Sequence, residues 1–211
     1  GLPGRRHSTG LARSWHLGVD VLWLVNGILF YVLLFATGQW TRIVPTTWDV
    51  FPHALSTLIQ YLSLNFPHHD SWVTYNGLQM LVYFVTVFIA APAAVLTGLL
   101  QSPLISLRLH AASSRLANVE VARSVHVLVL GWFVVFTIFH VTLVFATDVL
   151  ANLNHITTGL NDDSWMGVAL FAVGVAVIAA VWVAATPITV RRPQLIQRIG
   201  LALLGPFRRL L

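Results

Sequence analysis

Two histidines within one long apolar segment have the clearest capacity for chemistry. His126 and His140 lie fourteen residues apart, which on an α-helix brings their side chains to within about 40° of one face and separates them by roughly 21 Å along the axis. A histidine inside a membrane-spanning helix is costly without a partner, and is therefore a functional candidate. The spacing predicts a metal site near each membrane surface. Two haems held there would form a path for electrons. In the alternative, each histidine is neutral and bonded to a carbonyl or serine of a neighbouring helix.

Each six-coordinate haem needs a second axial ligand from another helix. For the site of His126 we expect His16, which lies at the inner start of the first apolar segment and thus at the same depth. The alternative for His16 is an interfacial histidine beside a tryptophan belt. For the site of His140 we expect His53. Three other histidines are expected on the same side, in polar loops where histidines are usually solvated: His68, His69 and His155.

Arginines near these depths could pair with the anionic propionates of haem. Arg13 and Arg123 are candidates on the inner side, and Arg42, beside Trp40, is the candidate on the outer side. A simpler explanation for the inner pair is that they mark membrane orientation. Arg42 has no such explanation, because it lies on the side that is otherwise poor in arginine.

The composition requires a lipid environment for these residues. Of 211 residues, 57% are hydrophobic and 9% are charged, whereas soluble domains carry about a quarter charged residues. The absence of cysteine excludes disulfides, thiolate metal sites and haem attachment through C-x-x-C-H. The net charge of +5 comes from arginine alone. Because the arginines flank apolar segments, they indicate topology and not nucleic-acid binding.

Four segments are long and apolar enough to cross about 30 Å of hydrocarbon. We expect one all-α domain over residues 1–211, an integral membrane four-helix bundle with spans at about 17–37, 72–100, 121–147 and 166–186. A soluble protein with buried helices is disfavoured, because a chain of this size cannot shield four apolar helices from water. The first segment is also too long for a signal peptide, and no A-x-A-like cleavage site follows it.

The arginines also predict the orientation. Eleven of the twelve lie in the N-terminal arm, in the tail, or between the second and third spans up to Arg123, which places both termini inside. The segment at about 48–66 is apolar at helical spacing but short, and predicts an amphipathic helix on the outer face. The tail at 191–211 predicts a second surface helix, on the inner leaflet. If 48–66 were instead a fifth span, the arginine-rich loop would lie outside and the charge rule would break.

Over roughly residues 7–160 the chain resembles the bacterial di-haem cytochrome b subunits, the membrane anchors of nickel–iron hydrogenases, formate dehydrogenase, thiosulfate reductase and related molybdopterin oxidoreductases. Besides His126 and His140, the motifs of the resemblance are Arg13-Ser14-Trp15-His16, Asn26-Gly27, Thr37-Gly38, Tyr75-Asn76-x-x-Gln79-x-x-x-Tyr83 and Leu96-Thr97-Gly98-Leu99.

The resemblance implies two b haems with bis-histidine ligation, and His16, His126 and His140 match the expected ligand positions. In the better-known members the fourth ligand comes from a second transmembrane helix, whereas the second span here has no histidine. This departure leaves His53 and the five-span topology open. The resemblance also implies a bacterial cytoplasmic membrane, quinone near the inner surface and an iron–sulfur, molybdopterin or nickel–iron catalytic subunit on the outer face. A catalytic subunit on the inner face remains an alternative.

Two other classes of function remain open. One is a haem-free membrane scaffold or assembly factor. The other is an ion or metal transporter with a histidine relay, but such proteins usually carry acidic residues inside their spans, and here only Asp20 lies near the beginning of one. His110, in the inner loop, is a candidate proton relay at a quinone site, although loop histidines are usually solvated.

Overall fold

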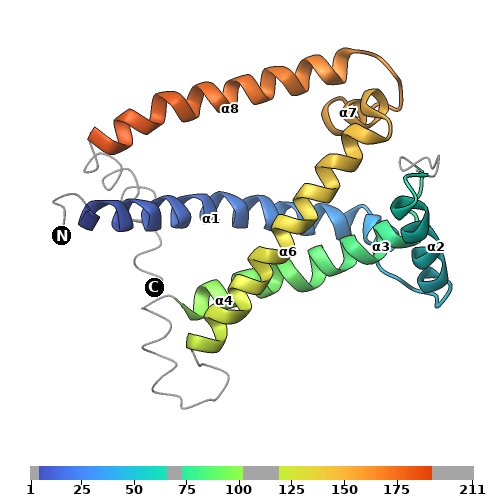
Figure 1. The fold of residues 1–211 in the computed structure, drawn as a ribbon, viewed down its shortest axis with the longest axis horizontal. Helices are drawn as coiled ribbons and strands as arrows, with labels where there is room; N and C mark the ends of the chain where they lie inside the picture. The colour runs from blue at the N-terminus through green and yellow to red at the C-terminus, as the bar shows by residue number, and fades with distance from the viewer. Residues whose placement is uncertain (1–4, 66–72, 102–118, 192–211) are drawn as a thin grey trace. The chain divides into compact units, whose positions relative to one another are not determined.

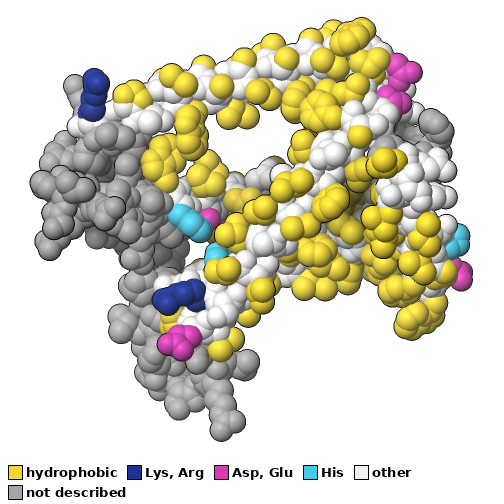
Figure 2. Space-filling view, viewed as in Figure 1, with side chains coloured by type: hydrophobic (Ala, Val, Ile, Leu, Met, Phe, Trp, Pro, Cys, Tyr) yellow, Lys and Arg dark blue, Asp and Glu magenta, His cyan; other side chains and the backbone are white. Residues whose placement is uncertain are grey.

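The computed structural model describes residues 5–65, 73–101 and 119–191. Within these ranges the chain is helical, with connecting turns and no strand (Figure 1). Four helical stretches are long and apolar enough to span a membrane: Gly18–Ala36, Gly77–Leu100, Val119–Ala146 and Met166–Pro187. The prediction of an all-α membrane protein with four spans is therefore confirmed. Figure 2 shows hydrophobic side chains along the lengths of these helices.

The helices follow the predicted spans but differ at their ends. Helix α1 covers Arg5–Ala36, α3 Gly77–Phe84, α4 Ala91–Leu100, α6 Val119–Ala146 and α8 Met166–Arg191. The second span was expected from residue 72 but begins at Gly77. The side-chain oxygen of Asn76 accepts a hydrogen bond from the backbone N–H of Gln79, and the side-chain oxygen of Gln79 accepts one from the backbone N–H of Asn76. This capping box starts the helix.

The expected amphipathic segment forms the short helix α2, Val50–Leu62, after the 3₁₀ turn η1, Gln39–Arg42. Its 13 residues span about 20 Å at 1.5 Å per residue, too little to cross the hydrocarbon. This length supports four spans over five. The tail from residue 192 lies outside the described residues, so the inner surface helix stays a prediction.

The chain divides into two compact units, and each is described by itself. In the first, which joins residues 1–39 to 172–211, the rings of Trp15 on α1 and Trp182 on α8 lie 6.2 Å apart. The second unit covers Trp40–Phe171, and its centre is the second span packed antiparallel to α6. The expectation of one domain over the whole chain stays a prediction.

The second span changes its hydrogen-bonding pattern near its middle. Pro92 lacks an N–H and cannot bond to the carbonyl four residues before it, which commonly kinks a helix. The turn ahead of it, η2 (Val85–Ala90), is π-helical, a local rearrangement that is common at functional sites. The indole of Trp132 on α6 donates to the Thr86 hydroxyl over 3.0 Å, and this hydroxyl donates to the carbonyl of Val82. The π turn is thereby fixed to α6.

A buried asparagine holds the corner between α7, Val149–Thr157, and α8. Asn154 is fully buried. Its amide nitrogen donates to the carbonyls of Asp162 and Ser164, and its amide oxygen accepts from the backbone N–H of Gly167 over 2.6 Å. One side chain thus satisfies three backbone groups of the connection, as a buried amide must.

Candidate functional site

Both intramembrane histidines lie on the face of α6 that packs against the second span. His126, Val129, Phe133, Phe136 and His140 are all partly buried, and their spacing of three or four residues forms one stripe along the helix. Side chains on the other faces are well exposed, such as Leu128 at 72% and Phe139 at 65%. The fourteen-residue spacing therefore places both histidines on one face of α6, as expected, with one at each end of the surface that contacts the second span.

His126 is bonded to a threonine of the second span. Its Nδ1 lies 2.9 Å from the hydroxyl oxygen of Thr97. That hydroxyl donates its own proton to the carbonyl of Ala93 over 2.6 Å, so it accepts a proton from the imidazole. The bond thus selects the tautomer with the proton on Nδ1 and the lone pair on Nε2. Gly98 packs beside the same ring, since an added Cβ would lie 3.6 Å from Cε1 of His126.

His140 is held by aromatic rings. It stacks on Phe136, one turn earlier on α6, with ring centroids 5.3 Å apart and planes 10° from parallel. The Tyr83 ring makes a T-shaped contact with it, with centroids 6.0 Å apart. Among the described residues, neither ring nitrogen of His140 has a hydrogen-bond partner. An imidazole in this state keeps a lone pair for a ligand, and its ring is oriented by packing.

The outer arginine candidate lies at the end of the unit where His140 lies. The guanidinium carbon of Arg42 sits 4.4 Å from the centre of the Tyr75 ring, a cation–π contact. Tyr75 in turn meets Tyr83 at 5.0 Å, and Tyr83 meets His140. Two rings therefore connect Arg42 to the histidine whose haem it was expected to serve.

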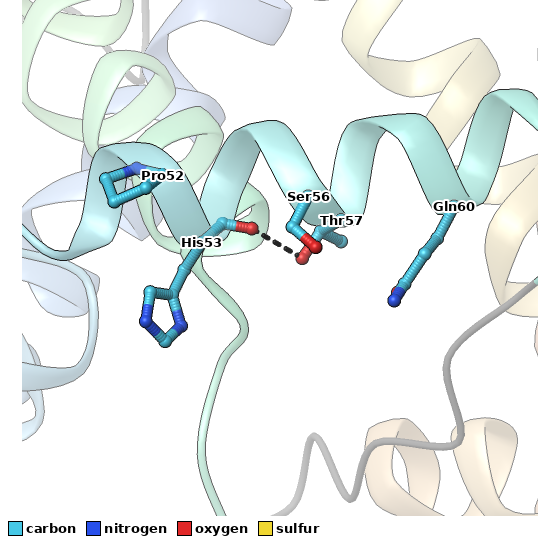
Figure 3. A pocket seen from close by; sticks show the side chains of 5 residues that line it. All are labelled: Pro52, His53, Ser56, Thr57 and Gln60. Atoms are coloured by element: carbon cyan, nitrogen blue, oxygen red, sulfur yellow. Dashed lines mark hydrogen bonds between the residues drawn. The ribbon is translucent and has the colours of Figure 1, made fainter.

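Among the described residues, His53 belongs to the short helix α2 and not to one of the spans. Its side chain is exposed on α2 and borders an open depression of about 320 Å³ with Pro52, Ser56, Thr57 and Gln60 (Figure 3). The Thr57 hydroxyl donates to the carbonyl of His53 over 3.0 Å. No hydrogen bond or ring contact joins His53 to His140, so its role as the fourth ligand stays a prediction.

In the first unit, His16 is oriented by a carboxylate. Its Nδ1 lies 2.6 Å from Oδ2 of Asp20, one turn later on α1, and the two side chains are 61% and 43% exposed. Hydrogen bonding of Nδ1 to a carboxylate is common for histidines that bind metal through Nε2. Arg123 is exposed on α6, whereas the side chain of Arg13 lies outside the described residues.

The other histidines that the sequence offered as candidates divide into two groups. His155 was expected in a polar loop but lies on α7, where its Nε2 is 2.6 Å from the side-chain oxygen of Asn161. This contact competes with a role as haem ligand. His68, His69 and His110 lie outside the described residues.

Three residues at these sites had no role assigned from the sequence: Asp20, Tyr83 and Thr97. The signal for Asp20 was its spacing of four from His16, which puts both on one helix face. Thr97 and Tyr83 belong to the motifs of the cytochrome resemblance, but sequence alone does not show which histidine each one meets.

Within the described ranges, no group of three or more histidine, aspartate and glutamate side chains could hold a metal ion. Bis-histidine haem ligation needs only two protein donors, so this finding leaves the predicted sites open. No protein-family model, curated protein or solved structure matches the chain.

Proposed function

We propose that the chain is the membrane-spanning electron-transfer subunit of a redox complex, with one b-type haem at the depth of His126 and another at the depth of His140. It would link a peripheral hydrogenase or a molybdopterin and iron–sulfur oxidoreductase to quinone, in a bacterial cytoplasmic membrane. The observation that supports this most is the presence of His126 and His140 on one face of α6, at opposite ends of its contact with the second span. The resemblance to the di-haem cytochrome b subunits supports the partners.

The chemistry of the donors fits haem. Bound haem supplies one-electron chemistry at its iron. His126 offers Nε2, since Nδ1 faces the Thr97 hydroxyl, and His140 offers a ring oriented by Phe136. In the first unit, His16 has Nδ1 against Asp20. Neutral imidazole nitrogens in an apolar setting are the ordinary ligands of b-type haem.

The chain's residues would have distinct roles in this function. His126 with His16, and His140 with His53, would hold the two haems through their imidazole nitrogens. Arg42 would neutralise propionates on the outer side, as Arg13 and Arg123 would on the inner side. The apolar side chains of α6 between the two levels, such as Val129 and Phe133, would exclude water.

A haem-free membrane scaffold is the second candidate. The bond between Thr97 and His126 and the stacking of His140 on Phe136 are contacts that purely structural intramembrane histidines would also make. The two candidates differ in what binds to Nε2 of His126 and to the ring nitrogens of His140.

A reduced-minus-oxidised spectrum of the purified chain, with pyridine haemochrome quantitation, separates the two candidates. Two haems per chain support the full proposal, and one haem removes one of the two sites. A colourless protein, purified from cells with ample haem, would overturn the proposal and leave the haem-free membrane scaffold as the remaining candidate. Reduction of the bound haem by a soluble quinol analogue then tests the quinone partner.

A further inference from the structure

We propose that Thr97 is the positioning residue for His126: it directs Nε2 to haem iron and lowers the reduction potential of the haem at this end. This inference rests on the proposed function, since it concerns the same ligand. Its physical basis is the hydrogen bond of a single hydroxyl group.

The positions of the protons determine the direction of that bond. Thr97 is buried, and its hydroxyl has one proton to give. The carbonyl of Ala93, at 2.6 Å, receives it. The 2.9 Å contact with Nδ1 of His126 is therefore made by the proton of the imidazole. The ring cannot turn over without losing this bond, so Nε2 is the nitrogen presented to a ligand.

The two ends of α6 differ in this respect. At His126 an oxygen accepts from Nδ1–H, whereas at His140 the neighbours are the rings of Phe136 and Tyr83, and the described residues supply no acceptor. An acceptor at Nδ1–H makes the imidazole more basic. A more basic axial ligand stabilises oxidised iron, which lowers the reduction potential.

The matched variants are Thr97→Val, which keeps the shape and removes the oxygen, and Thr97→Ser, which keeps the hydroxyl. Both are made in wild-type protein and in the His140→Ala background, where only the haem of His126 is expected. We expect Thr97→Val to weaken haem binding at this site by about 10- to 100-fold and to raise its midpoint potential. Thr97→Ser should retain wild-type values. Equal affinity and potential in Thr97→Val and wild type would overturn the inference while leaving the haem proposal in place.

A measurement without haem keeps the inference separate from the proposed function. In haem-free protein labelled with ¹⁵N-histidine, the signal of His126, assigned by its loss in His126→Gln, should report a proton on Nδ1. Thr97→Val should shift this signal toward the Nε2-protonated tautomer. If wild-type His126 carries its proton on Nε2, the inference fails, even if Thr97→Val does not fold and whether or not the chain binds haem.

Discussion

The backbones of α2 and α3 meet so closely at Gly77 that a Cβ there would lie 2.7 Å from the amide nitrogen of Ala54. It would also lie 2.7 Å from the carbonyl oxygen of Val50. Both neighbours are backbone atoms, which cannot rotate away. Glycine is therefore required where the short outer helix meets the start of the second span.

Gly77→Ala should loosen the contact between α2 and α3. Forcing a methyl group into a packed contact typically costs about 1–3 kcal/mol, and we expect a lower midpoint of thermal unfolding in detergent. Gly174→Ala is the control, because nothing lies within 4 Å of its added Cβ, and alanine in a helix is favoured over glycine by roughly 0.5–1 kcal/mol. Equal midpoints for the two variants would contradict the close approach.

His126→Ala and His140→Ala should each remove one haem, because each deletes an axial nitrogen at a different depth. The measurement is the pyridine haemochrome of each purified variant. His155→Ala is the matched control and should keep both haems, since its Nε2 already contacts Asn161. If either of the first two variants retained both haems, the ligand assignment would be wrong.

The fourth ligand is tested in the same series. His53→Ala should give the same spectrum as His140→Ala, with the same haem missing. If instead a variant of His68 or His69 gave that result, the outer ligand would come from the loop and not from α2.

The spans could be predicted because lipid imposes a long apolar run on any helix that crosses it. The shared face of His126 and His140 followed from helical periodicity alone. The contacts of His126 with Thr97, and of His140 with Tyr83, could not be predicted in the same way. They depend on how α6 is rotated and shifted against the second span, and this register is set by packing around Thr86, Trp132 and Gly98.

The sequence also did not predict the π turn or the residue at which the second span begins. Pro92 indicated a disturbance in the second span, but a kink and a π turn are both physical solutions to a missing N–H. The start at Gly77 was missed because Trp72 and Val73 extend the apolar run, while the capping box of Asn76 and Gln79 decides where helical hydrogen bonding begins. Apolar composition predicts membrane location better than it predicts helix ends.

The exposed apolar side of α2 should contact lipid. Phe51, Leu55, Leu58 and Leu62 form one exposed stripe, while Ala54 and Thr57 face the protein and His53, Ser56 and Gln60 lie on a third, polar side. Because the chain has no cysteine, single spin labels can be placed without background. In bilayers, a label at Leu55→Cys should be more accessible to oxygen than to a water-soluble nickel complex, and a label at Ser56→Cys the reverse. Equal accessibility would contradict an interfacial helix.

The turn before α8 should loosen in acid. Asp162 is exposed, and hydrogen bonds from the backbone N–H and then the hydroxyl of Ser164 hold its pKa below the usual 3.8. A lowered pKa means that the ionised carboxylate stabilises the folded turn. This contribution is fully present above pH 3.8 and is lost as the pH falls through the lowered pKa, because protonation then weakens the acceptor.

Hydrogen exchange of residues 158–166 measures this loss. Asp162→Asn keeps an acceptor oxygen but has no ionisable group at this position, so a comparison of the two proteins at each pH removes the intrinsic pH dependence of exchange and effects of pH elsewhere in the chain. Wild type should exchange more slowly than Asp162→Asn at pH 6, and the difference should shrink below about pH 4. A difference that stayed constant down to pH 2 would show that the charge of Asp162 does not order the turn, and that the Asn154 contacts alone hold the corner.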